Sequence, residues 1–290
     1  MAPQSRKPES KPKFRERSDR STAPQAEFDT YAPGYNAGMD NSLKALLGES
    51  AEQYVKLKLH WMLRRFPFLL TRGPATRILD YGCGTAMLLR LMAEGGVQAA
   101  LSGCDISPGM LEEAERRWDE HTAGARPALR LQTGSRAAFP DGDFDLVVIS
   151  SVLHHVRPEQ RGQVYEELCR LTRSGGQIVV FEHNPFNPVT RYVVARTPID
   201  QGVVLLQAGE VMRGLNAAGA TNLRTRYIMF APPRVLELPS VEYVFGWLPL
   251  GAQYVVTANA ASGAASKRHR RNSSPFRRLS EPLLAEKAAR

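Results

Sequence analysis

The chain has 290 residues, of which 43% are hydrophobic and 23% charged, and its net charge is +9. Its apolar stretches are strand-sized and far shorter than the roughly 18 residues that span a bilayer, so the composition excludes a transmembrane protein. Its three cysteines, Cys83, Cys104 and Cys169, form no Cys-x-x-Cys pattern. This excludes a disulfide framework or a cysteine-ligated zinc and predicts reduced thiols in the cytoplasm.

The excess positive charge lies at the two ends of the chain. Residues 1–26 carry seven Lys and Arg against three Asp and Glu, and residues 260–290 carry eight against two, which leaves −1 between them. Neither end has the apolar side chains that offset the entropy of ordering, so we expect two disordered basic tails. The first has no apolar core of a secretory signal, which again favours a cytoplasmic protein. Such tails can contact an anionic membrane surface, but charge confined to the ends argues against a nucleic-acid partner.

Helix and strand signals alternate between the tails. The capping-box spacing of Ser50 to Gln53 predicts a helix to about Phe66, within an N-terminal region of residues 27–70. Residues 71–259 then alternate short β-branched runs with amphipathic segments, a pattern typical of βαβ units and a parallel sheet. The seven predicted strands are Arg77–Tyr81, Ala100–Cys104, Ala128–Gln132, Phe144–Ile149, Gln177–Glu182, Asn222–Phe230 and Gln253–Ala258.

Capping residues place the helices between these strands. Ser107-Pro108 offers an N-cap with proline at the first helical position. Pro158 begins a helix through Leu171, which Gly175-Gly176 ends, and a further helix runs from Glu210 to Ala218.

Two connections, residues 184–207 and 231–252, are longer than usual, so we expect them to be substrate insertions. The apolar side chains of the second could wall a pocket, cover a sheet edge or form a homodimer contact.

The first strand runs into Gly82-Cys83-Gly84, where the lack of a side chain lets a ligand approach the backbone. Residue 87 is Met, so the dinucleotide fingerprint is incomplete, and the chain has no Gly-Lys-Ser/Thr sequence of a P-loop. Asp105 ends the second strand 21 residues after Gly84, where a carboxylate can accept hydrogen bonds from both hydroxyls of a ribose. The spacing indicates a ligand that contains a nucleoside.

Four segments in this order resemble the motifs of class I S-adenosylmethionine-dependent methyltransferases, and most of all the small-molecule type of ubiquinone and menaquinone biosynthesis. They are residues 80–84, 103–107, 139–156 and 171–176, and the resemblance covers about residues 28–230. It implies S-adenosylmethionine as cofactor and an α/β Rossmann-like fold. The expected fold is a seven-stranded, mostly parallel sheet with helices on both faces and the last strand antiparallel.

The resemblance also implies which residues contact the cofactor. Asp80, Gly82 and Gly84 would line its methionine end, Asp105 would hold the ribose and Ile106 would cover the adenine. Ser135 stands where many relatives have Asp beside the adenine amino group, and Ser150 would face the cofactor or the substrate. Tyr35 belongs to a segment that resembles a lid closing over the methyl donor.

Methyl transfer from a sulfonium needs alignment, a dry site and, for a protonated acceptor, a base. His183 and His155 are the candidate catalytic residues, and Tyr35, His154, Glu182, Asn184 and Arg191 are the candidate substrate contacts. The alternative is that the histidines cap or pack and that Asn184 and its neighbours form a proline-rigidified turn. Related quinone O-methyltransferases carry a metal site with the pattern Glu-x-x-Glu-His where this chain has Ser151-x-x-His154-His155, so we expect no metal.

The favoured function is methyl transfer to a small or lipid-like metabolite, with an oxygen acceptor preferred. The first alternative is an RNA methyltransferase, although the chain lacks both the Asn/Asp-Pro-Pro-Tyr/Phe motif and a Pro-Cys nucleophile. The second is a non-catalytic binding module, against which Gly82, Gly84 and Asp105 argue.

Overall fold

The computed structural model describes residues 28–30, 32, 50–71, 73–122, 125–231 and 244–261. Nearly all of both expected tails lie outside these ranges, as do Tyr35 and residues 232–243 of the second insertion. No helix within the described ranges is both long and apolar enough to cross a bilayer.

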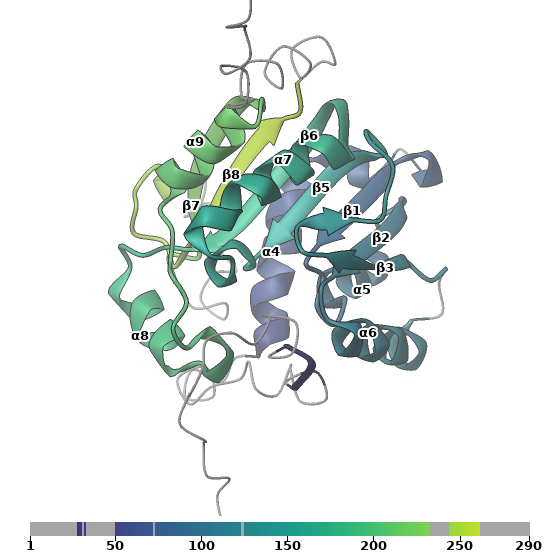
Figure 1. Cartoon of the computed structure of the whole chain (residues 1–290), viewed down its shortest axis with the longest axis horizontal. Helices are drawn as coiled ribbons and strands as arrows, with labels where there is room; N and C mark the ends of the chain where they lie inside the picture. The colour runs from purple at the N-terminus through teal and green to yellow at the C-terminus, as the bar shows by residue number, and fades with distance from the viewer. Residues whose placement is uncertain are drawn as a thin grey trace, which may run out of the picture.

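One eight-stranded sheet forms the centre of the molecule, in the order β4-β3-β2-β1-β5-β6-β8-β7 (Figure 1). In the sheet, β3, β2, β1, β5 and β6 run parallel to one another. Strand β8 pairs antiparallel with both β6 and β7. The mostly parallel sheet with an antiparallel last strand is therefore confirmed. The strands are β1 (Arg77–Tyr81), β2 (Ala100–Asp105), β3 (Ala128–Thr133), β4 (Arg136–Ala137), β5 (Phe144–Ser150), β6 (Thr172–His183), β7 (Thr221–Ile228) and β8 (Gln253–Asn259).

The sheet has eight strands in the described ranges rather than the expected seven. The additional strand, β4, pairs antiparallel with the end of β3. Gly134, with a φ of +57°, lies in the turn between them. Two residues are too few to give an alternating pattern, so the sequence offers no periodic signal for this strand.

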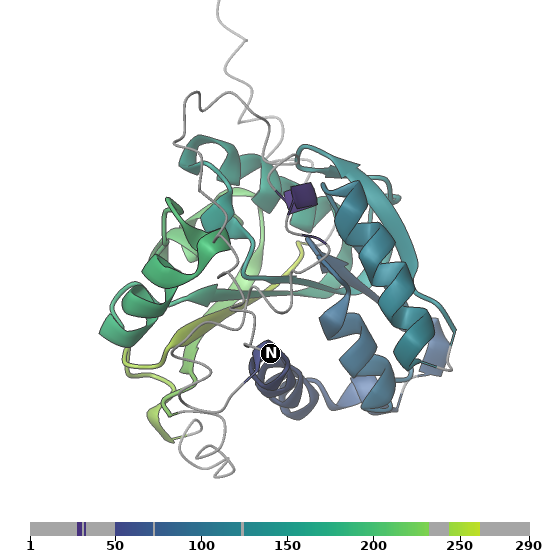
Figure 2. The same ribbon diagram turned by 90° about the horizontal axis from the view of Figure 1, so that it is seen from below.

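Helices cover both faces of the sheet, which crosses the middle of the view in Figure 2. Successive strand side chains point to opposite faces: Ile78 packs in a core with α4, α5 and α6, and Leu79 packs in a core with α7 and α9. The helices are α4 (Ala51–Arg65), α5 (Met87–Glu94), α6 (Pro108–His121), α7 (Arg161–Leu171), α8 (Pro188–Arg196) and α9 (Ala208–Ala217).

The capping signals placed two helix starts correctly. The backbone N–H of Ser50 donates to Gln53 Oε1 at 2.7 Å, and Ser107 Oγ accepts from the N–H of Met110 at 3.0 Å. Elsewhere the expected bounds need correction. Residues 158–160 form a separate 3₁₀ turn before α7, which ends at Leu171, so that Gly175-Gly176 lies within β6. The helix expected at 210–218 begins at Ala208.

The first insertion contains a helix, α8, rather than loop alone. Asn187 caps it, because its Oδ1 accepts from the N–H of Thr190 at 2.9 Å, and Pro188 occupies the first helical position. A 3₁₀ turn, η6 (Pro198–Asp200), follows α8.

The carboxyl ends of β1, β2, β5 and β6 lie along one edge of the sheet, as parallel pairing requires. Asp80, Asp105, Ser150 and His183 therefore lie along this same edge, although Asp80 and His183 are 103 positions apart in the sequence.

Candidate active site

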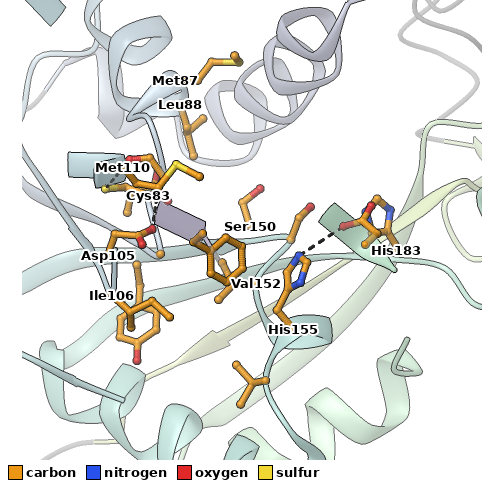
Figure 3. A pocket seen from close by; sticks show the side chains of 18 of the residues that line it. Cys83, Met87, Leu88, Asp105, Ile106, Met110, Ser150, Val152, His155 and His183 are labelled. Carbon is orange, nitrogen blue, oxygen red and sulfur yellow. Dashed lines mark hydrogen bonds and ion pairs between the residues drawn. The ribbon is translucent and has the colours of Figure 1, made fainter. Parts of the chain in front are cut away.

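A cavity of about 590 Å³ lies at this edge of the sheet. Asp105 and Ile106 lie on one side of it and His155 and His183 on the other (Figure 3). The predicted residues that line it are Asp80, Gly82, Gly84, Asp105, Ile106, Ser135, Ser150, His155 and His183.

The glycine loop between β1 and α5 forms one wall of the cavity. Gly82 and Gly84 have φ values of +72° and +51°, which favour glycine, and the N–H groups of Gly82 and Cys83 donate to Cys104 O. A Cβ on Gly82 would lie 2.6 Å from Val152 Cγ2. A side chain there would therefore disturb the wall of the cavity before it reached a ligand.

Asp105 holds this loop in place. Its Oδ2 accepts from the N–H of Gly84 at 2.8 Å, and its Oδ1 accepts from the N–H of Ser107 at 3.0 Å. Burial raises the pKa of this carboxyl, although the backbone hydrogen bonds oppose the shift. The carboxylate lines the cavity and has further lone pairs with which to accept hydrogen bonds from a ligand.

Lys58 is a residue of this site that the sequence analysis missed. It lies on α4, only 5% exposed, and its Nζ donates to Ser150 Oγ at 2.8 Å and to Ser151 Oγ at 3.1 Å. Burial raises the pKa of Asp80 to about 7, and the charge of Lys58 lowers it while that of Asp105 raises it. Lys58 lies seven residues after Ala51 and four before Met62, a spacing that puts all three on the buried face of an amphipathic helix. A lysine on that face was the signal in the sequence.

Gln132 is a second residue of this site that the sequence analysis missed. It lies three positions before Ser135, where many relatives have Asp. Its Nε2 donates to Gly134 O at 3.0 Å, and its buried Oε1 has no hydrogen-bond partner among the described residues. Ser135 contributes its carbonyl, which accepts from the Tyr81 hydroxyl at 2.6 Å. Gln132 is also one of the residues that line the cavity, and a buried acceptor without a partner calls for a donor.

The opposite wall carries a cluster of three histidines and two carboxylates. His154 Nδ1 lies 2.6 Å from Glu182 Oε2, and Glu182 Oε1 accepts from the N–H groups of Val152 and Leu153. Asp200, from η6 of the first insertion, lies with its Oδ1 3.5 Å from His154 Nε2 and 3.4 Å from His155 Nε2. No local pattern joined Asp200 to the histidines, because the 44 residues between His155 and Asp200 include β6 and α8.

The charges in this cluster follow from burial and proximity. Burial alone would lower the pKa of His154, but Glu182 and Asp200 outweigh it and raise the value to about 9. Burial and the charge of His154 lower the pKa of His183 to about 3 and also lower that of His155. Burial opposes ionisation of Glu182, but His154 brings its pKa down to about 2. At neutral pH, His154 is therefore the charged imidazole, and His155 and His183 are neutral.

Four of the predicted substrate contacts do not line the cavity. Asn184 is fully buried and closes a turn, since its Nδ2 donates to the carbonyls of Pro249 and Gly251 and its Oδ1 accepts from the N–H of Phe186. Arg191 is exposed on α8. His154 and Glu182 are buried behind the wall, so they act on the cavity only through their neighbours. The turn alternative is therefore the better description of Asn184.

Comparisons with known proteins agree with this geometry. Residues 78–176 match a family model described as a methyltransferase domain. The demethylmenaquinone methyltransferase of Beutenbergia cavernae is 39% identical over 111 residues, which are 38% of this chain and 41% of that protein. The demethylmenaquinone methyltransferase of Thermus thermophilus is 31% identical over 162 residues, which are 54% of this chain and 64% of that protein. A phosphatidylethanolamine N-methyltransferase of Cereibacter sphaeroides is 32% identical over 107 residues, 37% and 50%. The chain thus matches between 41% and 64% of the length of these curated relatives.

Solved structures share the fold at low sequence identity. A putative methyltransferase in complex with a Haloferax volcanii methyltransferase activator aligns with a TM-score of 0.57 at 15% identity, over 82% of this chain and 98% of that one. A methyltransferase from Archaeoglobus fulgidus aligns with a TM-score of 0.52 at 18% identity, over 72% and 95%.

The matched family model identifies residues 78–176 as similar to a methyltransferase domain, and solved methyltransferase structures share the fold of the sheet and its helices. The curated relatives that the chain resembles are methyltransferases.

Proposed function

We propose that the protein transfers the methyl group of S-adenosylmethionine to a small or lipid-like acceptor, with an oxygen as the acceptor atom. The observation that carries the proposal is the single cavity that joins the glycine loop and Asp105 to His155, His183 and Asp200. A cofactor bound along the loop would point its reactive end toward the histidines, so donor and acceptor would meet inside one cavity.

The cofactor end of the cavity has a partner for each polar part of S-adenosylmethionine. Asp80 would attract the positive charge at the methionine end, Asp105 would accept from the ribose, and Gln132 would accept from the adenine amino group that meets Asp in many relatives. Ile106 supplies an apolar surface for the adenine ring.

The acceptor end combines apolar walls with neutral imidazoles. Val152, Val193 and Met229 line the cavity there, and the ring of Phe28 lies edge-on to His155 at 5.2 Å. Apolar walls favour a lipid-like acceptor, as do relatives named for demethylmenaquinone and for phosphatidylethanolamine. A cytoplasmic location and contact of the tails with a membrane surface are compatible with such an acceptor and belong to the same proposal.

His155 is better placed than His183 to act on the acceptor. It lines the cavity, and Asp200 lies beside its Nε2, where a carboxylate stabilises the imidazolium that forms when a proton is taken up. The low pKa of His183 makes it a poor proton acceptor, so its proposed role is to contact the acceptor.

The proposal is tested by incubating the protein with methyl-labelled S-adenosylmethionine and fractionated cell extract. We expect label in a small-molecule or lipid fraction. Label in RNA would instead support an RNA methyltransferase, and cofactor binding without transfer to any fraction would support a binding module.

A further inference from the structure

The cluster beside the cavity contains a set of donors suited to a metal ion. His154, His155 and Asp200 each offer one ligand atom, and these atoms all lie within 4.8 Å of one another. Two imidazoles and one carboxylate are ligands that zinc and other divalent transition metals prefer. We propose that these three residues, the His-His-Asp site, bind one divalent transition-metal ion.

The orientation of His154 points independently to a ligand. Its side chain is 1% exposed, and its Nε2 has no hydrogen-bond partner within the described part of the chain. The other ring nitrogen, Nδ1, is held by Glu182, which the N–H groups of Val152 and Leu153 fix in turn. A carboxylate behind a histidine is the arrangement that orients metal-binding imidazoles and increases their basicity.

The charge of the cluster favours a cation. Glu182 is 0% and Asp200 6% exposed, so two buried carboxylates flank His154, one at each ring nitrogen. In the metal-free protein the charged His154 compensates one of the two carboxylates. An ion bound to His154 would displace its proton, and the two carboxylates would then balance the charge of one divalent cation. Burial of uncompensated charge is costly, so this compensation would stabilise the fold as well as the site.

The site faces the acceptor end of the cavity. His155 and Asp200 line the cavity and His154 lies behind them, so an ion held by all three would keep a side open toward the cavity. Three protein ligands with an open position are typical of catalytic rather than structural metal sites. An ion in this place would supply Lewis-acid chemistry, lowering the pKa of a hydroxyl that approaches it. With the ion bound, His155 would act on the acceptor as a ligand of the ion rather than as a base. This role rests on the proposed function, but the binding of the ion does not.

The proposed site differs from an expectation drawn from the sequence, which stays a prediction. No metal was expected because the chain lacks the two glutamates of the Glu-x-x-Glu-His pattern. In the structure, the carboxylate comes from Asp200 in η6, and His154 supplies a second imidazole.

The test is titration of the chelator-treated full chain with Co²⁺ and Zn²⁺, followed by calorimetry and by the visible absorption of Co²⁺. No cofactor or acceptor is added. We expect one ion per chain and a cobalt spectrum typical of low coordination number. Glu182→Gln should weaken binding about 10- to 100-fold, the usual effect of losing an outer partner, and Asp200→Asn and His155→Ala should weaken it further. His60→Ala, on the exposed face of α4, is the matched control and should bind as the wild type does.

The proposal is overturned if the wild type binds no stoichiometric ion, or if Asp200→Asn and His155→Ala both bind as tightly as the wild type. Circular dichroism checks that each variant is folded. If Asp200→Asn does not fold, His155→Ala, at a half-buried position, serves as the second variant. Metal binding without methyl transfer would contradict the proposed function alone, and methyl transfer without metal binding would contradict this inference alone.

Discussion

Asp105 has two tasks at once, because it fixes the glycine loop and faces the cavity. Asp105→Asn keeps the shape of the side chain but replaces one acceptor oxygen with an NH2 group, which cannot accept from an N–H. We expect S-adenosylmethionine affinity, measured by calorimetry, to fall about 10- to 150-fold, since a charge-assisted pair contributes roughly 1.5–3 kcal/mol. Asp119→Asn, exposed on α6, is the control. Equal affinities for Asp105→Asn and the wild type would remove Asp105 from the cofactor site.

The raised pKa of Asp80 makes the stability of the cofactor-free protein depend on pH. The folded pKa of about 7 exceeds the ordinary value of 3.8, so between these values the folded protein binds the extra proton and the unfolded chain does not. Asp80 therefore destabilises the fold above pH 7, and this penalty disappears as the pH falls toward 4. We expect the melting temperature of Asp80→Asn to exceed that of the wild type at pH 8 and the difference to shrink at pH 5. A difference that stays constant across this range would show that Asp80 ionises normally.

At the scale of elements, the turn between β1 and α5 shapes the cofactor end of the cavity. Gly82 and Gly96 have similar φ values, +72° and +77°, but a Cβ meets Val152 only at Gly82 and has open space at Gly96. Gly96→Ala should therefore show only the backbone cost of about 1–2 kcal/mol, measured by chemical unfolding, and keep its cofactor affinity. Gly82→Ala should be less stable than Gly96→Ala and bind the cofactor more weakly. Equal losses in the two variants would mean that Val152 moves aside without consequence.

The sequence predicted the elements with strong local signals and missed those that depend on distant contacts. All seven long strands and the starts at Ser50 and Ser107 were readable from periodicity and capping. The cap and proline that begin α8 were also present in the sequence, but the interpretation as an insertion obscured them. Asp200 and Lys58 could not be placed, because the sheet topology brings them to the site across many residues. The polar side chain of Asn184 was expected at the site, but its Nδ2 donates to the backbone carbonyls of Pro249 and Gly251 instead.

At the scale of the whole molecule, the charge distribution predicts that the basic ends do not support the fold. Deletion of residues 1–20 and 262–290 removes segments of low apolar content and keeps the region from Phe28 onward. We expect the melting temperature and the cofactor affinity of the shortened chain to stay close to those of the full chain. A fall of several degrees would show that one of these ends packs against the body.

The shared cavity also predicts that cofactor binding and methyl transfer can be separated by one substitution. The most direct measurement compares S-adenosylmethionine affinity and turnover in the wild type and His155→Ala, with His60→Ala as the control. We expect turnover of His155→Ala to fall about 10²- to 10⁴-fold, because the residue acts on the acceptor, while its cofactor affinity stays nearly unchanged. Unchanged turnover, or a loss of affinity as large as the loss of turnover, would contradict the assignment of the histidine side of the cavity to the acceptor.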